Sequence, residues 1–230
     1  MKLMLITPGI DIPTGTYEDF GIPGTIVAEY LRENKIIPEK CDLGDILFLL
    51  TPAETEEKLH RLLEKLVQLE TFIDQDAPME KVLPQVYDAY ETYYKGYTIK
   101  KLCQEMHDFY KERNVAALQQ QLFDQNHLPP YAMSPREAEG EYFRGNGELI
   151  DLKDAEGRIA LEGALPYPPG ILCIHPGERW TKTAIHYFIT EYLVSKQSVL
   201  LTCQQRHGLS GQLTTYHFFI SVGKYLNKSI

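Results

Sequence analysis

The amino-acid sequence predicts a mixed α+β fold, and three observations support that prediction. Short apolar runs at 2–6, 36–37 and 46–50 end in turns rich in Pro, Gly or Thr, which is typical of buried strands. Apolar residues recur at helical spacing over 18–34 and again over 59–73, with polar side chains on the other face. The first fifty residues therefore read as strand, helix, strand, strand, and a longer helix follows.

The predicted helices have recognisable start and stop signals. The first helix ends near Asn34, which we expect to be its left-handed C-terminal cap. The next helix is predicted to begin at Thr51, whose hydroxyl would accept from the third backbone N–H while Glu54 reaches back to the cap. Pro52, directly after Thr51, suits the first helical position, where no backbone N–H donor is needed. The helix then runs to the break at 74–78, and we place a domain boundary at residue 76.

The second part of the chain is predicted to mix helices and strands. Three helices are expected first, over 83–94, 98–113 and 116–125. Another short helix opens at Ser134, because Ser134 and Glu137 form a capping-box pattern. Strands are expected at 148–152 and 158–161, which makes this part α+β as well.

Composition and charge exclude several classes of protein. The 230 residues carry 32 acidic and 23 basic side chains, for a net charge of −9, which is the wrong sign for neutralising phosphates. We therefore expect no nucleic-acid partner. The longest apolar runs are far too short to span a membrane, and the N-terminal residues lack a signal-peptide pattern, so we expect a cytoplasmic protein. The four cysteines are dispersed and predict neither disulfides nor zinc.

The charge is distributed unevenly along the chain. Every acidic residue lies at or before Glu191, and the 39 residues of 192–230 contain four basic residues and no acidic one. An asymmetry of this length needs a cause beyond ordinary variation in composition.

Candidate metal ligands occur only in pairs. Cys103 and His107 lie four residues apart on a predicted helix, as do His60 and Glu64, so each pair shares one helix face. Two ligands do not make a metal site. We favour the alternatives, a core thiol beside a boundary histidine and a surface pair, and we expect no bound metal.

Three other segments have open interpretations. The glycines of 140–147 follow a helix and lack a Lys-Ser/Thr pair, so we interpret them as a turn rather than a phosphate loop. Three prolines and two glycines make 162–170 a stiff loop, for which a structural crossover is favoured over a binding loop. Glu39, beside Pro38, is either a pocket carboxylate that would attract a substrate ammonium or a solvated strand end, and the second is favoured.

Six segments of the sequence together resemble one protein family. They are LITPGID (5–11), YEDFGIPGTIVAEYLREN (17–34), IIPEKCDL with ILFLLTPAET (36–55), DAPMEKVLP (76–84), GYTIKKLCQEMHDFY (96–110) and AEGRIALEGALPYPPGILCIHPGERW (155–180). In this order they resemble the C-terminal portion of the bacterial fold type I, pyridoxal-phosphate-dependent ornithine/lysine/arginine decarboxylases, and the ornithine branch in particular. The resemblance covers about 180 of the 230 residues.

The resemblance implies a division into three parts. Residues 1–76 resemble the end of an aminotransferase-like small domain, and 77–191 resemble the family's own α+β C-terminal domain. Residues 192–230 depart from the family where the acidic residues stop, and we interpret this tail as out of frame. The alternative is a genuine, divergent basic tail.

The resemblance also implies what the chain does and does not carry. The whole family enzyme converts ornithine to putrescine and CO2 with pyridoxal 5'-phosphate, in polyamine biosynthesis or in the response to acid. The Ser-x-His-Lys segment that holds the cofactor is absent, since no His-Lys pair occurs. We therefore expect no catalytic, cofactor-binding or metal-binding residue in this chain, and no turnover by it alone. One family role matches a residue here: Glu39 would face the distal amine of the substrate.

Two functional hypotheses follow. In the first, the chain is the C-terminal part of an ornithine decarboxylase and needs a PLP-binding catalytic region as its partner, within a homo-oligomer of dimers. An exposed apolar patch would then be expected on the first fifty residues. In the second, the chain is a non-catalytic module that binds an intact decarboxylase and regulates it.

Overall fold

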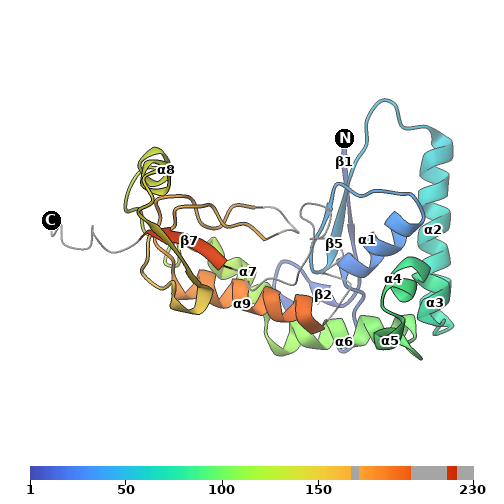
Figure 1. Cartoon of the computed structure of the whole chain (residues 1–230). Helices are drawn as coiled ribbons and strands as arrows, with labels where there is room; N and C mark the ends of the chain where they lie inside the picture. The colour runs from blue at the N-terminus through green and yellow to red at the C-terminus, as the bar shows by residue number, and fades with distance from the viewer. Residues whose placement is uncertain (167–170, 198–216, 222–230) are drawn as a thin grey trace. The chain divides into compact units, whose positions relative to one another are not determined.

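The computed structural model describes residues 1–166, 171–197 and 217–221 (Figure 1). The described residues divide into two compact units, 1–116 together with 194–197, and 117–193 together with 217–221. Each unit combines helices with antiparallel strands, so the predicted α+β class is confirmed. The predicted boundary at residue 76 falls inside the first unit, directly after its longest helix, and stays a prediction.

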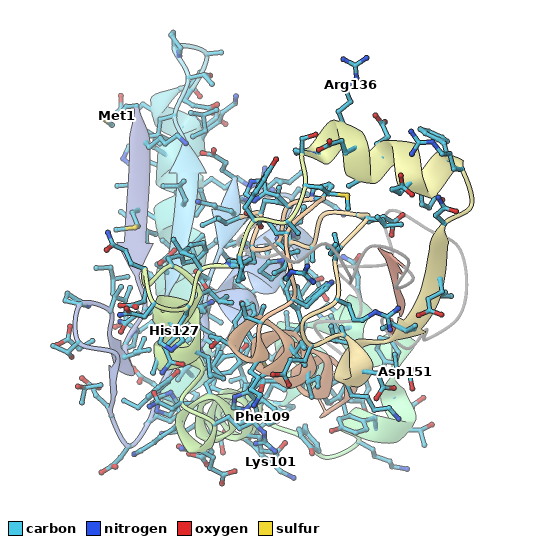
Figure 2. All side chains as sticks on the ribbon, turned by 90° about the vertical axis from the view of Figure 1, so that its left-hand side faces the viewer. Met1, Lys101, Phe109, His127, Arg136 and Asp151 are labelled. Atoms are coloured by element: carbon cyan, nitrogen blue, oxygen red, sulfur yellow. The ribbon has the colours of Figure 1, made fainter. Side chains whose placement is uncertain are left out.

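A three-stranded antiparallel sheet forms one side of the first unit. Its order is β1 (Lys2–Ile6), β5 (Asp45–Leu49), β4 (Lys40–Cys41), and Lys2 lies opposite Leu49. The Met1 ammonium, at the end of β1 (Figure 2), donates to the Leu50 carbonyl at 2.8 Å. A small hairpin, β2 (Ile10–Asp11) with β3 (Thr16–Tyr17), follows β1.

The expected strand at 36–37 is wrong. These two residues follow the end of the first helix, where the Ile36 N–H donates to the Leu31 carbonyl at 2.8 Å and is therefore not available for a strand partner. Pairing begins after Pro38, with the Glu39 N–H donating to the Leu47 carbonyl at 2.8 Å.

Helix α1 (Gly24–Glu33) covers the sheet, with Ile26 and Leu31 fully buried. It begins later than the apolar periodicity predicted, because 16–17 is a strand and Pro23 occupies the N-cap. The prediction for its C-terminus is also wrong: Asn34 has φ −87°, and the left-handed residue is Lys35 at φ 62°.

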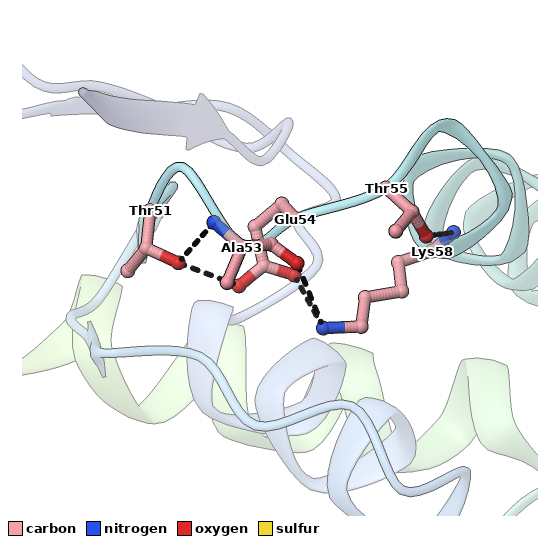
Figure 3. A network of polar contacts seen from close by, with 5 residues as sticks. All are labelled: Thr51, Ala53, Glu54, Thr55 and Lys58. Carbon is pink, nitrogen blue, oxygen red and sulfur yellow. Dashed lines mark hydrogen bonds and ion pairs between the residues drawn. The ribbon is translucent and has the colours of Figure 1, made fainter.

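Helix α2 (Glu56–Asp74) begins four residues after the predicted start. Thr51 is not its cap: the Thr51 hydroxyl accepts from the Ala53 N–H at 3.3 Å within a turn. The N-cap is Thr55, whose hydroxyl accepts from the Lys58 N–H at 3.4 Å (Figure 3). Glu54 faces this turn and pairs with the Lys58 ammonium at 3.2 Å. Both threonines have a hydroxyl that could cap a helix, and the N-cap of α2 is the second of them, Thr55.

Four more helices complete the first unit: α3 (Met79–Val82), α4 (Pro84–Ala89), α5 (Glu91–Tyr94) and α6 (Ile99–Glu112). The single helix expected at 83–94 is wrong, because Tyr90 at φ −139° separates α4 from α5. The predicted turns at Gly96 and Asn114 are confirmed, with φ values of 78° and 47°. Thr98 caps α6 by accepting from the Lys101 N–H at 3.3 Å.

The second unit contains α8 (Pro135–Phe143), β6 (Gly147–Asp151), η1 (Leu152–Asp154) and β7 (His217–Ser221), together with most of α7 (Val115–Leu122) and α9 (Lys182–Gln197). The capping box of α8 is confirmed, with Glu137 accepting from the Ser134 N–H at 2.8 Å. Strand β6 is confirmed and pairs antiparallel with β7. The strand expected at 158–161 is wrong, since Ile159 forms only an isolated bridge with Arg179.

Within the described ranges, no helix is both long enough and apolar enough to cross a membrane. Helix α9 runs through Glu191, where the acidic residues stop, and most of the predicted tail beyond Gln197 lies outside the described residues.

Candidate functional site

Glu39 lies where the chain enters β4. Its backbone is fixed by the bond from its N–H to the Leu47 carbonyl, and Pro38 before it is buried. The side chain is about one-third exposed, at 32%. Glu39 is therefore a carboxylate on a fixed backbone with an open side, which suits the binding of an ammonium ion.

The Glu39 carboxylate already has a cation from the same chain. Lys2 Nζ donates to Glu39 Oε1 at 3.0 Å. Lys2 is on β1 and Glu39 precedes β4, so the ion pair connects the two edge strands of the sheet across β5. Sequence reasoning missed Lys2, because only the strand pairing brings residues 37 positions apart together.

The sheet carries exposed apolar side chains beside this ion pair. Met4 and Ile6 alternate with the buried-side residues of β1 and are 56% and 63% exposed, and Leu49 on β5 is 52% exposed. Lys2, Met4 and Ile6 share one face because strand side chains alternate. The expected apolar patch on the first fifty residues is therefore present, on the face of the sheet that also carries Lys2.

Neither candidate metal pair is part of a larger ligand cluster in the part of the chain that the structure describes. Cys103 is fully buried in α6, and burial raises the pKa of its thiol to about 12. His107 Nε2 bonds to the Glu18 carbonyl at 2.9 Å, which ties α6 to the segment after β3. His60 and Glu64 are exposed on α2. Among the residues that the structure describes, no group of three metal-ligating side chains comes together.

The structure describes the first glycine-containing segment fully and the second only in part. The 140–147 segment is the end of α8 followed by a turn with Gly145 at φ 73°, as interpreted from the sequence. Ala164, near the start of the 162–170 loop, forms an antiparallel bridge with Ile174, which lies after the loop. Residues 167–170, at its centre, lie outside the described part, so the choice between crossover and binding loop stays open.

Comparison with known proteins defines the class of protein. The family model for the major domain of Orn/Lys/Arg decarboxylases matches residues 1–58, and the model for their C-terminal domain matches 116–198. The second match ends within the predicted tail. These two models identify the chain as part of a decarboxylase.

Individual relatives agree with the family models. The chain is 55% identical over 187 residues to the inducible ornithine decarboxylase of Lactobacillus sp. (strain 30a), covering 81% of this chain and 26% of that protein. It is 56% identical over 188 residues to the ornithine decarboxylase of Haemophilus influenzae, covering 82% and 26%. The structure of the E. coli constitutive lysine decarboxylase matches with a TM-score of 0.82 at 27% identity, covering 96% of this chain and 31% of that one.

The chain therefore belongs to the Orn/Lys/Arg decarboxylase family and corresponds to part of its major domain together with its C-terminal domain. Its sequence is similar to that of the ornithine decarboxylases, and it spans about a quarter of the length of these curated relatives.

Proposed function

We propose that this chain serves as the C-terminal part of an ornithine decarboxylase, which converts ornithine to putrescine and CO2. The observation that carries the proposal is the identity of 55% to 56% with two ornithine decarboxylases, against 34% to 37% with the lysine decarboxylases of Hafnia alvei, Pseudomonas aeruginosa and E. coli over a similar stretch of the chain. The thiols of Cys103 and Cys173 are buried and form no disulfide, as expected of a protein that works in the reducing cytoplasm.

The residues of this chain do not fit the cofactor by themselves. Family decarboxylases hold pyridoxal phosphate through a lysine, and such a lysine needs an enclosed site. Among the described residues every lysine is at least partly exposed, and the buried polar set contains only Thr7, Thr25, His107, Glu141 and Thr190. We therefore propose that the cofactor and its lysine belong to a catalytic region outside this chain.

In this proposal Glu39 binds the distal ammonium of ornithine. The carboxylate has a fixed backbone and a partly open side, and Lys2 shows that it accepts an ammonium at 3.0 Å. A charge-assisted contact of this kind favours a diamino acid over an analogue without the second amine. The apolar face around Met4, Ile6 and Leu49 would pack against the catalytic region, within a homo-oligomer.

A reconstitution assay tests the proposal. The purified chain is assayed for CO2 release with ornithine, lysine or arginine and pyridoxal phosphate, and cofactor absorbance is recorded. The same assay follows co-expression with the remaining N-terminal part of the Lactobacillus ornithine decarboxylase. We expect no release and no Schiff-base band from the chain alone, and ornithine-specific release from the pair. Turnover by the chain alone, or none by a stable pair, would overturn the proposal.

The same preparation distinguishes the second hypothesis, a regulatory module. If the chain binds only to an intact ornithine decarboxylase and changes its rate, without restoring activity to the N-terminal part, the module hypothesis holds. Glu39→Gln provides the matched site test in the reconstituted pair. We expect it to raise KM for ornithine at least tenfold, and Glu29→Gln on α1 to leave KM unchanged.

A further inference from the structure

The first unit contains a hollow between α5, the turn after it and α6. Its volume is about 460 Å³, which is in the usual range for small-molecule sites. The rings of Tyr93, Tyr97 and Phe109 contribute to its lining, as do the carboxylates of Glu105 and Asp108. Leu102 and Met106, both buried, form the apolar part of its wall. All these residues belong to the same compact unit.

The lining combines negative charge with aromatic faces. It has three carboxylates, the third being Glu112, and one cationic side chain, Arg113. The Tyr97 hydroxyl donates to Glu105 Oε1 at 3.4 Å. Burial, and then the charge of Glu105, raise the pKa of Tyr97 to about 12, so this hydroxyl keeps its proton and its bond to the carboxylate. Aromatic faces and carboxylates together attract organic cations.

Two cations of the chain already use this chemistry. Lys101 Nζ lies 3.9 Å from the centroid of the Tyr97 ring and 3.9 Å from Glu105 Oε1. Arg113 lies 3.7 Å from the centroid of the Phe109 ring and pairs with Glu112 at 3.6 Å. Lys101 and Phe109 both come from α6 (Figure 2). An ammonium held between a ring and a carboxylate is thus an arrangement that this hollow supports.

We infer that this hollow binds a linear aliphatic diamine or polyamine. One ammonium would take the place of Lys101 between Tyr97 and Glu105, and the methylenes would lie along Leu102 and Met106. A second ammonium would reach the carboxylates of Asp108 or Glu112. Glu39 is not among the residues that line this hollow, and binding there would not depend on turnover.

The competing role of Lys101 gives the sharpest test. Binding of putrescine and spermidine to the whole chain is measured by isothermal titration calorimetry at low ionic strength. We expect saturable binding, with Kd raised at least tenfold by Glu105→Gln and lowered about threefold by Lys101→Met. If the Lys101–Glu105 pair had only a structural role, the two substitutions would not change Kd in opposite directions.

A second Lys–Glu pair provides the matched control. Glu54 and Lys58 are also four residues apart and lie 3.2 Å from each other, but at the N-terminus of α2 and away from the hollow (Figure 3). Glu54→Gln and Lys58→Met change the net charge by the same amounts and should leave Kd unchanged. If substitutions in the two pairs changed Kd equally, the net charge of the chain alone would attract the diamine, and the inference would be overturned.

Two further comparisons keep the inference falsifiable if one variant fails to fold. Butylamine and 1,4-butanediol should bind at least tenfold more weakly than putrescine, since each lacks an ammonium that the hollow would pair. Tyr97→Phe keeps the ring and should lose little affinity, whereas Tyr97→Leu should lose most of it. Absence of saturable putrescine binding to the folded chain would refute the site and would leave the proposed decarboxylase role unaffected.

Discussion

Lys2 and Glu39 join the two edge strands of the first unit through a single ion pair of 3.0 Å. The lysine side chain is 59% exposed and the carboxylate 32% exposed, so water and salt weaken the attraction. The pair therefore contributes little to folding, and Glu39 can exchange Lys2 for another ammonium at small cost.

A double-mutant cycle measures this cost. Lys2→Met, Glu39→Gln and the double variant are unfolded with urea in the whole chain. We expect a coupling free energy of about 0.2–1 kcal/mol, falling further in 0.5 M salt, as for other exposed pairs. A coupling above about 2 kcal/mol would show that Lys2 holds Glu39 too tightly for substrate exchange.

The two threonines before α2 predict a clear difference in stability. Thr55→Ala removes the hydroxyl that caps the helix and should cost about 1 kcal/mol in the free energy of unfolding. Thr51→Ala removes only a turn contact to Ala53 and to Glu54 and should cost about half as much or less. Urea unfolding of both variants checks this. A larger loss of stability from Thr51→Ala than from Thr55→Ala would mean that the helix begins at Thr51, as the sequence predicted.

Thr51 and Thr55 also show which features of the fold could be predicted from the sequence. The caps of α8 and the turns at Gly96 and Asn114 follow from residue type, and they were predictable. The start of α2 was not, because Thr51 and Thr55 have the same capping chemistry and residue type alone does not choose between them. The Glu39 position was predictable as a strand entrance, but its partner Lys2 required the pairing of β1 with β5. The polar hollow was missed because it forms between α5, the turn with Tyr97 and α6, and the sequence predicted one continuous helix over 83–94 in place of α4 and α5.

Gly21 lies directly against the His107 ring, and a Cβ there would approach Nδ1 to 2.2 Å. The ring cannot easily move, because it is buried and its Nε2 bonds to the Glu18 carbonyl. We expect Gly21→Ala to destabilise the chain by about 1–3 kcal/mol through overpacking. Thermal unfolding, followed by circular dichroism, measures it.

Gly140 is the matched control for this substitution. It lies inside α8, where a Cβ would meet only the far end of the Arg144 side chain at 3.2 Å. Gly140→Ala should therefore raise the free energy of unfolding by about 0.5–1 kcal/mol, since alanine favours a helix. If the two substitutions shift the melting temperature alike, the contact between Gly21 and His107 has no energetic role.

Glu33 makes the stability of the first unit depend on pH. From α1, its carboxylate accepts from the Gln85 N–H at 3.2 Å and from the Val86 N–H at 3.0 Å, at the start of α4. Burial raises the pKa of Glu33 above its usual value, although the two backbone bonds act in the opposite direction. Because the folded chain holds this proton more tightly than the unfolded chain, the Glu33 contribution is full below the usual pKa and is lost as pH rises through the folded pKa.

Glu33→Gln removes this titration and should change the pH profile in a defined direction. The amide oxygen still accepts one backbone bond, so we expect the variant to be destabilised most near pH 4 and less near pH 7. Glu33→Ala loses both bonds and should cost about 1–3 kcal/mol at either pH. Urea unfolding at the two pH values measures this, with Glu64→Gln on the exposed face of α2 as the control. A destabilisation by Glu33→Gln that grows from pH 4 to pH 7 would mean that the two backbone bonds outweigh burial and that the Glu33 pKa is lowered.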